Sequence, residues 1–420
     1  MKVLEPKELK KRRDHRIKNQ KSKRRKRSIT PLLIVILAIY VIASLVIPIP
    51  SLQANVITPK MPAASLVNLP WPSYGQAAIG AVGYGSLAQN GEQKPLPIAS
   101  VAKVLTVLAV LKARPIMQGE QGDIITITAY DVATYNANAS EGQSVVLVKE
   151  GEQITEYQAL QALLLPSANN MADVLVRWVF GSTDDYLVFV NTFAKTLGMA
   201  NTSIADASGF SPKTTSTAGD LTKLAEIAMN NPVITEIIAM PQAEIPVAGI
   251  IYNVNNQIGS NGIIGIKTGN TDEAGGCYMF AAKRKIDDKN SVVVFGVIMG
   301  GPDRSSAIAD SLPLLDEAFR NFKVIKPVAT NQIVGTVSQR GGEKVPVIVQ
   351  QDVSVVTWSA QSSTAEINMN ELTTKVDAGA EVGTLTLYVG NMTYNMPLIT
   401  ALKIGDRTPL WRLQHAGGYI

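Results

Sequence analysis

The stretch PLPIASVAKVLTVLAVLKA, from Pro95 to Ala113, places Ser100 and Lys103 three residues apart at the start of an apolar segment. The pattern predicts a helix over Ser100–Ala113 with Ser100 as its N-cap. Residues three apart share a helix face, so the hydroxyl and the amine can meet. Serine needs a base, and lysine can be that base only when burial or nearby positive charge keeps it neutral. Two interpretations follow: a nucleophile with its base, or a capped helix carrying an ordinary polar residue.

Histidine is almost absent from the chain, which limits the possible chemistry. His15 lies in the basic N-terminal region and His415 lies six residues from the end. A Ser-His-Asp triad and a histidine-based metal site are therefore excluded from the first large domain. The one cysteine, Cys277, cannot form an intramolecular disulfide and is predicted to be a small buried hydrophobe. Acyl-transfer chemistry in this domain must use another base.

The charge of the chain is concentrated at its N-terminus. The chain has 420 residues and a net charge of +5, but residues 1–28 alone carry about +11, and the remainder is acidic. Residues 31–50, PLLIVILAIYVIASLVIPIP, contain no charge and are long enough to cross a bilayer as one helix. Basic residues flanking such a segment stay cytoplasmic. We therefore expect a single-pass membrane anchor, with an N-terminal tail in the cytoplasm and the catalytic domain outside. A cleavable signal peptide and a nucleic-acid-binding tail are the alternatives.

The composition and hydrophobic pattern of the sequence change twice after the apolar segment. Residues 51–64 resemble an extended linker, and residues 65–322 mix apolar helical segments with strand-like runs such as IIGIKTG, GCYMFAAKR and SVVVFGVIMG. From about residue 323 to 412 the chain consists of short β-rich runs separated by Gly, Asn and Asp, which predicts a small all-β domain. The expected divisions are a basic tail (1–28), a transmembrane anchor (31–50), a linker (51–64), a catalytic domain (65–322) and a C-terminal β-rich domain (323–412).

Two further short motifs favour a catalytic role for Ser100. Ser167-Ala168-Asn169 lies where two apolar helices are broken at Pro166, so a hydroxyl and a carboxamide could point into a cleft. Lys267-Thr268-Gly269 ends an apolar strand, whose edge can pair with an extended peptide and whose glycine lets that backbone approach closely. Each tripeptide alone is weak evidence. Together and in this order the three motifs match one known constellation.

With these motifs, the sequence resembles the serine D-Ala-D-Ala carboxypeptidases, the low-molecular-weight penicillin-binding proteins. The segments LGMANTSIADASGFSP and IKTGNTDEAGGCYMFAAKR carry the resemblance beyond the motifs. It covers residues 65–322 well, and the β-rich remainder resembles the family's C-terminal domain more loosely. The implied fold is of the α/β (α+β) penicillin-binding and β-lactamase-like transpeptidase type. It has a mainly antiparallel sheet flanked by helices, a small C-terminal all-β domain and an N-terminal transmembrane helix.

The resemblance also implies roles for individual residues. Ser100 would attack the carbonyl between the two D-alanines of a peptidoglycan stem peptide, Lys103 would take its proton, and Ser167 would relay that proton to the leaving amine. Lys267 would supply positive charge near the terminal carboxylate of the substrate and would lower the pKa of Lys103. β-Lactam antibiotics would acylate the same serine, and no metal or organic cofactor is implied. The residues expected at the substrate are Asn169, Lys267, Thr268, Gly269 and Asn270.

Departures from the family pattern leave alternatives open. Asn170 and Met171 follow the second motif, where the family more often has an acidic and a small residue. No Glu-x-x-Leu-Asn sequence lies between Leu197 and Asp220, which argues against a class A-type β-lactamase. A DD-endopeptidase that cuts cross-links, and a catalytically silent wall-binding homologue, remain alternatives. The end of the chain, DRTPLWRLQHAGGYI, lacks a convincing apolar stripe, so we expect no C-terminal membrane anchor.

Overall fold

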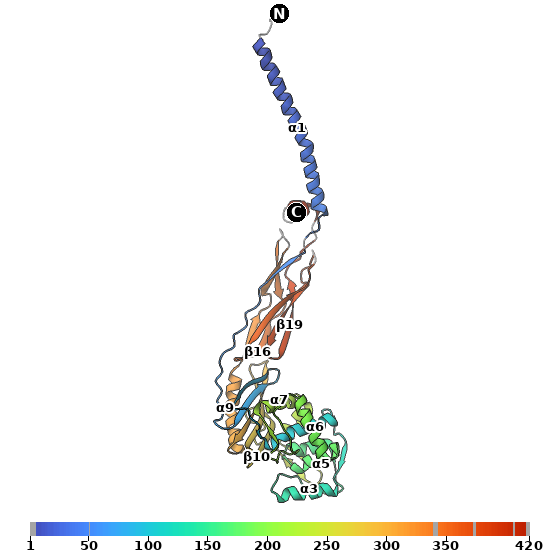
Figure 1. Cartoon of the computed structure of the whole chain (residues 1–420), viewed down its shortest axis with the longest axis vertical. Helices are drawn as coiled ribbons and strands as arrows, with labels where there is room; N and C mark the ends of the chain where they lie inside the picture. The colour runs from blue at the N-terminus through green and yellow to red at the C-terminus, as the bar shows by residue number, and fades with distance from the viewer. Residues whose placement is uncertain (1–5, 50, 339–342, 373–374, 406–407, 417–420) are drawn as a thin grey trace.

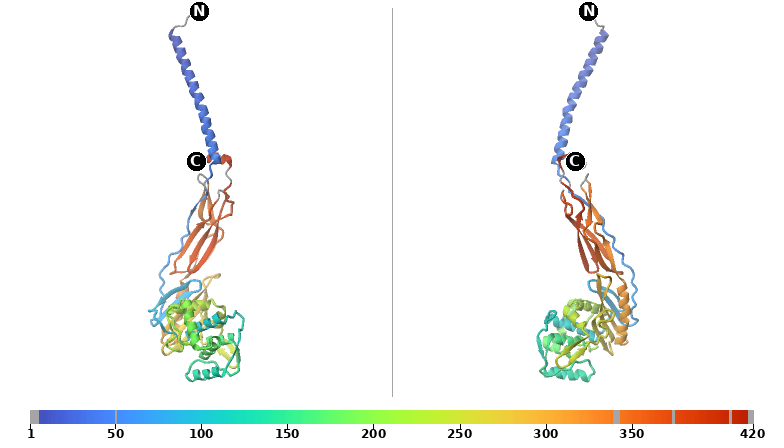
Figure 2. Two further views of the ribbon diagram at one scale, coloured as in Figure 1. Left: turned by 45° about the vertical axis from the view of Figure 1, so that its right-hand side comes forward. Right: turned by 180° about the vertical axis from the view of Figure 1, so that it is seen from behind.

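The computed structural model describes residues 6–49, 51–338, 343–372, 375–405 and 408–416. The chain is elongated, with a long N-terminal helix at one end, a β-rich domain in the middle and a mixed domain of helices and strands at the far end (Figure 1). Two further views show the same order (Figure 2). The mixed domain is therefore separated from the N-terminal helix by the length of the β-rich domain.

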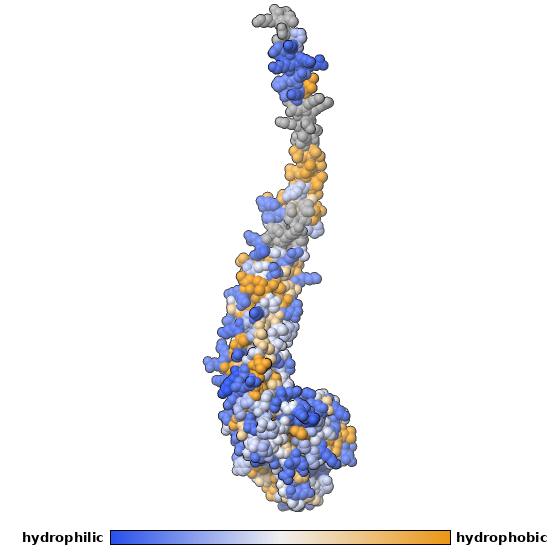
Figure 3. Space-filling view, turned by 60° about the vertical axis from the view of Figure 1, so that its left-hand side comes forward, coloured by the Kyte–Doolittle hydropathy of each residue, from blue (hydrophilic) through white to orange (hydrophobic). Residues whose placement is uncertain are grey.

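Helix α1 (Pro6–Val46) contains most of the basic tail and most of the apolar segment in one continuous helix. A hydrophilic outer part is followed by a hydrophobic band nearer the β-rich domain (Figure 3). Apolar side chains in that band are exposed, among them Leu32 at 59%, Leu37 at 62% and Ile42 at 61%. Within the described residues, no helix combines the length and apolar character that crossing a membrane requires. The predicted span over 31–50 is therefore not confirmed, and residues 1–5 of the expected tail and residue 50 of the expected span lie outside the described residues.

A five-stranded antiparallel sheet is the centre of the mixed domain, and its strand order is β10-β11-β12-β2-β3. Helix α9 (Arg304–Arg320) packs on one face, and α7 (Ala218–Met229) packs on the other. Thr217 caps α7, since its side chain accepts a hydrogen bond from the Asp220 N–H. The strands are β2 (Gln76–Ala81), β3 (Gly85–Asn90), β10 (Ile263–Thr271), β11 (Gly275–Lys285) and β12 (Ser291–Gly301). Strand β10 lies at an edge of this sheet, so one side of it faces other elements.

Helix α2 (Ala102–Ala113) forms the centre of the helical part of this domain. Every residue from Ala102 to Leu111 is buried, because α2 packs against helices on several sides. Its helical neighbours are α4 (Glu156–Leu164), α5 (Asn169–Phe180), α6 (Thr183–Thr196) and α7. Farther out, α3 (Ala129–Ser140) packs on α5, and α8 (Pro232–Ile238) packs on α4 and α7. Three short strand pairs complete it: β4 (Leu96–Pro97) with β7 (Thr215–Ser216), β5 (Ile124–Thr126) with β6 (Gln153–Thr155), and β8 (Gln242–Ile245) with β9 (Gly249–Tyr252).

The β-rich domain contains a six-stranded antiparallel sheet of order β1-β14-β15-β19-β18-β17 and a pair of strands, β13 with β16. Strand β1 (Gln53–Val56) pairs with β14, so part of the segment expected to be a linker (51–64) belongs to this sheet. The chain thus enters the β-rich domain before it forms the mixed domain and returns to it afterwards. The other strands are β13 (Phe322–Val328), β14 (Ile333–Ser338), β15 (Lys344–Val349), β16 (Val353–Trp358), β17 (Ser363–Met369), β18 (Glu381–Val389) and β19 (Met392–Thr400).

Aromatic residues join the two domains through one continuous apolar core. The rings of Tyr84 and Phe322 meet edge to face at 5.2 Å, and Phe319 lies 6.4 Å from Phe322. The Tyr84 hydroxyl donates to the Val356 carbonyl at 2.7 Å, and the Trp358 indole donates to the Ala318 carbonyl at 3.3 Å. Because apolar packing and satisfied polar groups both cross this boundary, the domains are held in a fixed relation.

Helix α10 (Pro409–His415) brings the end of the described chain back to α1. The Tyr40 hydroxyl donates to the Leu413 carbonyl at 2.7 Å, and the Arg412 guanidinium donates to the Ile47 carbonyl. The His415 ring stacks on Trp411 with a centroid distance of 4.4 Å. Helix α10 therefore meets the C-terminal end of α1, at the end of the β-rich domain that is remote from the mixed domain, whereas the start of α1 lies at the far tip of the molecule (Figure 1).

Candidate active site

Ser100 lies in a short 3-10 turn, η1 (Ala99–Val101), that precedes α2. The prediction that Ser100 caps the helix is wrong, because α2 begins at Ala102 and no side chain caps it. Ala99 has a φ of +46°, a left-handed conformation that is uncommon for a residue with a side chain. Such backbone conformations persist only where the surroundings enforce them, and they concentrate at functional sites. The turn leaves Ser100 half-buried and its hydroxyl free of any capping role.

The amine of Lys103 is fully buried and has three partners. Its Nζ lies 2.8 Å from Ser100 Oγ, 2.6 Å from Asn169 Oδ1 and 2.8 Å from the Ser208 carbonyl oxygen. The sequence-based pairing of Ser100 with Lys103 is thus found in the structure, together with two acceptors from other elements. Asn169 comes from the second motif, and Ser208 comes from the loop that precedes β7.

Burial lowers the pKa of Lys103 to about 7, while the charges of Asp206 and Asp173 act in the opposite direction. The amine is therefore neutral in a large fraction of molecules near neutral pH. A neutral amine has two hydrogens and one lone pair. Asn169 Oδ1 and the Ser208 carbonyl can only accept hydrogen bonds, so they take the two hydrogens. The lone pair then faces the Ser100 hydroxyl, which is the one partner with a proton to give.

The second motif lies between α4 and α5, as the break at Pro166 predicted. Ser167 has a φ of +67°, the second left-handed non-glycine residue at this site, and only 6% of it is exposed. Asn169 is the first residue of α5, and its Nδ2 donates to Gln143 Oε1 at 2.5 Å. The carboxamide of Asn169 is therefore held between Lys103 on one side and Gln143 on the other.

The third motif lies on the edge strand β10, which contacts η1. Lys267 is buried and its Nζ donates to the Thr268 carbonyl at 2.9 Å. A Cβ atom at Gly269 would lie 3.0 Å from the Ser100 backbone nitrogen, so glycine permits a close approach of strand and turn. Asn270 follows and is exposed. The three motifs are thus assembled around Ser100.

The pKa of Lys267 is lowered well below its usual value, first by burial and then by the positive charges of Lys103 and Arg304. We expected the charge of Lys267 to lower the pKa of Lys103, but the shift at Lys103 results from burial. The repulsion between the two lysines instead adds to the shift at Lys267. Arg304, at the start of α9, is a cation near the third motif that the sequence analysis did not identify.

A loop from Asp206 to Phe210 positions the Ser208 carbonyl, and sequence reasoning missed it. The Asp206 carboxylate accepts hydrogen bonds from Thr214 Oγ1 at 2.5 Å, from Ser208 Oγ at 2.7 Å and from the Phe210 N–H at 2.9 Å. Gly209 has a φ of +78°, and a Cβ there would lie 1.9 Å from the Ala99 carbonyl oxygen. The cluster of short polar residues around a glycine in ADASGF is a turn signal that could have indicated this loop.

Asn170 shows how one departure from the family pattern is accommodated. Its Nδ2 donates to the Val146 carbonyl at 2.9 Å, and its Oδ1 accepts from the Val146 N–H at 3.0 Å. A carboxamide can make both bonds, whereas an ionised carboxylate can only accept. The Asn169 N–H also donates to the Ser144 carbonyl at 2.7 Å. These bonds fasten the loop of residues 141–152 to the start of α5.

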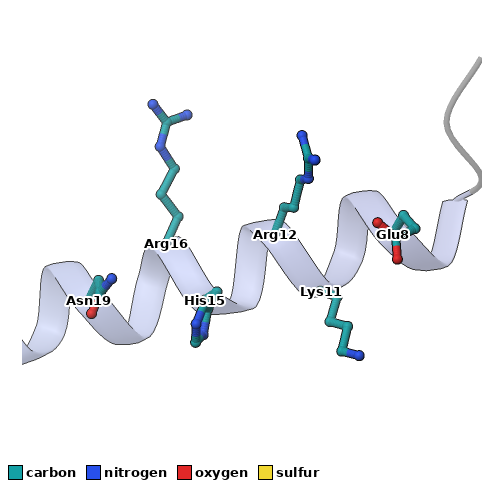
Figure 4. A pocket seen from close by; sticks show the side chains of 6 residues that line it. All are labelled: Glu8, Lys11, Arg12, His15, Arg16 and Asn19. Carbon is teal, nitrogen blue, oxygen red and sulfur yellow. The ribbon is translucent and has the colours of Figure 1, made fainter.

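Cys277, possible metal ligands and the basic part of α1 were the other candidates for function in the sequence. Cys277 is buried, and burial raises the pKa of its thiol to about 11, which confirms the prediction of a buried hydrophobe. Within the described part of the chain, no three His, Cys, Asp or Glu side chains are grouped to hold a metal ion. On α1, a set of side chains spreads outward from one helix without an opposing wall (Figure 4). These are Glu8, Lys11, Arg12, His15, Arg16 and Asn19.

Half-buried Ser100 lies beside buried Lys103, whose pKa is lowered, and next to an edge strand that carries a second buried lysine. This arrangement is suited to acyl transfer by a serine with a lysine as its base. The sequence model of D-alanyl-D-alanine carboxypeptidases (peptidase S11) matches residues 83–299, just over half of the chain. The chain therefore belongs to this family of serine hydrolases that act on peptidoglycan. The C-terminal domain of penicillin-binding protein 5 matches residues 322–405.

Individual relatives agree with the family assignment. D-alanyl-D-alanine carboxypeptidase DacF of Bacillus subtilis (strain 168) is 24% identical over 311 residues, 71% of this chain and 77% of that protein. DacC of Escherichia coli (strain K12) is 26% identical over 331 residues, 76% of this chain and 81% of that protein. The crystal structure of a peptidoglycan synthesis regulatory factor (PBP3) from Streptococcus pneumoniae shares the fold, with a TM-score of 0.60. That match has 18% identity and covers 81% of this chain and 100% of the other.

Proposed function

We propose that Ser100 carries out the DD-carboxypeptidase reaction by forming an acyl-enzyme with a stem peptide that ends in D-Ala-D-Ala. Ser100 Oγ attacks the carbonyl between the two D-alanines while neutral Lys103 accepts the hydroxyl proton. The bond to the terminal D-alanine nitrogen then breaks, and water releases the shortened peptide in a second step. The contact of 2.8 Å between Lys103 Nζ and Ser100 Oγ is the observation that carries this proposal.

The proton taken by Lys103 must reach the amine of the departing D-alanine. We assign this relay to Ser167, the first residue of the second motif, whose position is fixed by its left-handed backbone and its burial. The backbone N–H groups of Ser100 and Asn270 are the proposed oxyanion donors, since Gly269 lets the strand approach the turn closely. Preorganised donors of this kind typically contribute about 3–4 kcal/mol each.

The edge strand β10 is the proposed binding surface for the substrate. An extended peptide can pair with a strand edge through main-chain hydrogen bonds. Lys267, whose pKa is lowered in the free site, becomes the cation for the terminal carboxylate, because a negative charge bound beside it favours the ammonium form. Thr268 donates a hydrogen bond to the same carboxylate, and Asn169 holds a backbone amide of the peptide. A β-lactam has an acyl bond and a carboxylate in a comparable arrangement, so it should acylate the same serine.

Labelling with a fluorescent penicillin tests the nucleophile. The wild-type chain should be labelled covalently, and Ser100→Ala should not. Ser203→Ala is the matched control, because Ser203 is an exposed serine of the same domain and should leave labelling intact. Label on the Ser100→Ala variant, or no label on the wild type, would contradict the proposal.

The products from purified peptidoglycan fragments test the reaction. Chromatography with mass spectrometry should show the loss of one terminal D-alanine from pentapeptide stems. Conversion of cross-linked dimers into monomers without that loss would instead indicate a DD-endopeptidase that uses the same residues. Labelled protein that changes neither substrate would indicate a wall-binding homologue without hydrolytic activity.

We further propose that α1 anchors the chain in the cell membrane, with the N-terminus in the cytoplasm and the catalytic domain outside. The uncharged segment 31–50, the basic residues before it and the exposed apolar band of α1 support this placement. A membrane-impermeant maleimide should label Lys60→Cys in intact cells but not Lys18→Cys. Cys277 is buried and should add little background. Equal labelling of both variants would contradict the proposed topology.

The β-rich domain of residues 323–412 is proposed to hold the catalytic domain of residues 65–322 at a fixed distance from α1. The aromatic junction around Phe322 and the pairing of β1 with β14 support a rigid spacer. Shortening a rigid spacer should reduce the trimming of wall peptides in cells without changing penicillin acylation in detergent. Equal loss of both activities would mean that the domain supports the catalytic fold itself.

A further inference from the structure

Gln143 connects the surface of the catalytic domain to the proposed base through an unbroken line of hydrogen bonds. Its Nε2 donates to Glu141 Oε2 at 2.7 Å, and its Oε1 accepts from Asn169 Nδ2 at 2.5 Å. Asn169 Oδ1 in turn accepts from Lys103 Nζ at 2.6 Å, and Nζ meets Ser100 Oγ at 2.8 Å. Four contacts therefore link an exposed carboxylate to the serine.

Each group in this line fixes the orientation of the next. An ionised Glu141 can only accept, so Gln143 must turn its NH₂ group towards it and its oxygen towards Asn169. Asn169 must then present its own NH₂ group to Gln143 and its oxygen to Lys103. Lys103 must donate to that oxygen, and the Ser208 carbonyl takes its other hydrogen. The lone pair is left for Ser100.

We propose that Gln143 is a positioning residue, which locks the Asn169 carboxamide in the orientation that directs the Lys103 lone pair at Ser100. This inference rests on the proposed roles of Ser100 and Lys103. Without the lock, the carboxamide can rotate and offer Nδ2 to Lys103. The neutral amine would then accept that hydrogen bond, and its lone pair would no longer be available to the serine.

The backbone around Gln143 is ordered well enough for such a role. The loop of residues 141–152 is fastened to α5 by the bond from the Asn169 N–H to the Ser144 carbonyl and by the two bonds between Asn170 and Val146. Gln143 itself is half-buried, whereas Glu141 is exposed. The carboxamide of Gln143 is therefore held by its own loop as well as by its two partners.

The acylation rate and its pH dependence test the proposal in the full-length protein, solubilised in detergent. The second-order rate constant for acylation by a fluorescent penicillin should rise with pH as Lys103 loses its proton. The charged groups around Lys103 are Asp206 on its loop, Asp173 on α5 and Lys267 on β10. None of them is changed in the variants below. A shift of the acidic limb, which is the part of the pH–rate profile where the acylation rate constant rises with pH, therefore reports on the line of hydrogen bonds.

Gln143→Leu keeps much of the side-chain volume but removes both hydrogen bonds. Its acylation rate constant at pH 8.5 should fall by about 10–100-fold, the effect of losing the partly buried hydrogen bond that orients Asn169. The acidic limb should move to lower pH, because Nδ2 of a rotated Asn169 disfavours the lysine ammonium. Gln153→Leu is the matched control, since Gln153 is exposed on β6 of the same domain; its rate constant and limb should not change.

Gln143→Glu should move the limb the other way. A carboxylate can only accept, so it preserves the orientation of Asn169, and the exposed Glu141 can turn away into water. The rate constant at pH 8.5 should stay within about threefold of wild type, and the added negative charge should move the limb to higher pH. A merely structural role for Gln143 would not give shifts of opposite sign in two variants with similar melting temperatures.

Three outcomes overturn the proposal. Gln143→Leu could match wild type in both rate and limb, its limb could move in the same direction as that of Gln143→Glu, or it could be acylated faster than wild type. The last result would make Gln143 an obstacle to the substrate amide. Absence of label on the wild-type protein would contradict the proposed roles of Ser100 and Lys103, and this result differs from all three outcomes above.

Discussion

Around Lys103 the chain buries amines, whereas around Phe322 it buries aromatic rings. At the active site two lysines are fully buried with lowered pKa values, and Ala99 and Ser167 have left-handed backbones. At the domain junction the rings pack edge to face, and the polar atoms of Tyr84 and Trp358 are satisfied by backbone carbonyls. Both regions exclude water, but only the second lowers the free energy of the fold by doing so.

The difference shows which buried groups the fold needs and which the chemistry needs. A buried ammonium is unfavourable, so the site holds Lys103 in a form that is ready to accept a proton. Left-handed residues cost about 1–3 kcal/mol each and must be held by their surroundings. The junction contains neither feature. We therefore expect substitutions at the site to affect the reaction first, and substitutions at the junction to affect stability first.

The largest effect is expected from Lys103→Met. Methionine fills a similar volume but cannot accept a proton, so acylation by penicillin should fall by about 10²–10⁴-fold, the usual contribution of a general base. The orphaned Asn169 Oδ1 and Ser208 carbonyl oppose the gain from removing a buried amine, so the melting temperature should change little. Stopped-flow acylation and thermal melting measure the two quantities. A variant that unfolds without losing reactivity per folded molecule would reverse the comparison.

The opposite pattern is expected from Phe322→Ala. Removing a buried aromatic ring typically costs about 3–5 kcal/mol, because both burial and packing are lost. The free energy of unfolding from urea titration should fall by that order. The acylation rate constant, corrected for the folded fraction, should stay within about twofold of wild type. A large fall in that corrected rate would show that the junction controls the site and that the two regions are not independent.

The parts that the sequence could predict are those that depend on local pattern. An uncharged run of apolar residues after Lys103 indicated the buried helix α2, and Pro166 indicated the break before Asn169. The alternation of short β-rich runs indicated the second domain, which the match to residues 322–405 supports. Each of these signals is read from residues that are neighbours along the chain, so no knowledge of the tertiary structure was needed.

The parts that sequence reasoning missed depend on segments that meet only after folding. Ser100 fits an N-cap by residue type, but the left-handed Ala99, against which Gly209 packs, makes it part of a turn instead. Gln143 has no distinguishing local pattern and contacts Asn169, which lies 26 positions away. The turn around Asp206 has a local signal, but its contact with the site does not, since Ser208 lies 105 positions from Lys103. Strand β1 pairs with β14 across about 280 residues, so its sequence resembled a linker.

A smaller effect is expected from Gly209→Ala, which tests the contact between the loop and the turn. The new Cβ would lie 1.9 Å from the Ala99 carbonyl, and alanine disfavours a φ of +78°. The loop should shift and move the Ser208 carbonyl away from Lys103. We expect a loss of about 1–3 kcal/mol in the free energy of unfolding and about a tenfold slower acylation. Gly181→Ala controls for the backbone effect, since its φ is +80° but nothing lies within 4 Å of the added atom. If both variants slow acylation equally, the contact with Ala99 is not responsible.

The smallest effect concerns the pH dependence of stability, and it isolates the buried amine. The pKa of Lys103 is about 7 in the fold and 10.5 as its ordinary value. Between these values the unfolded chain binds a proton that the folded chain does not, so the free energy of unfolding should rise with pH. One such group contributes at most about 1.4 kcal/mol per pH unit. Urea titrations between pH 7.5 and 9 limit the contribution of the Cys277 thiol, whose pKa is raised from 9.0 to about 11 and which therefore acts in the opposite direction as the pH approaches 9. Because Lys267 adds a slope of the same sign, the informative quantity is the difference between wild type and Lys103→Met. That difference should grow with pH across the window; parallel lines would mean that Lys103 keeps its proton in the fold and is not the neutral base.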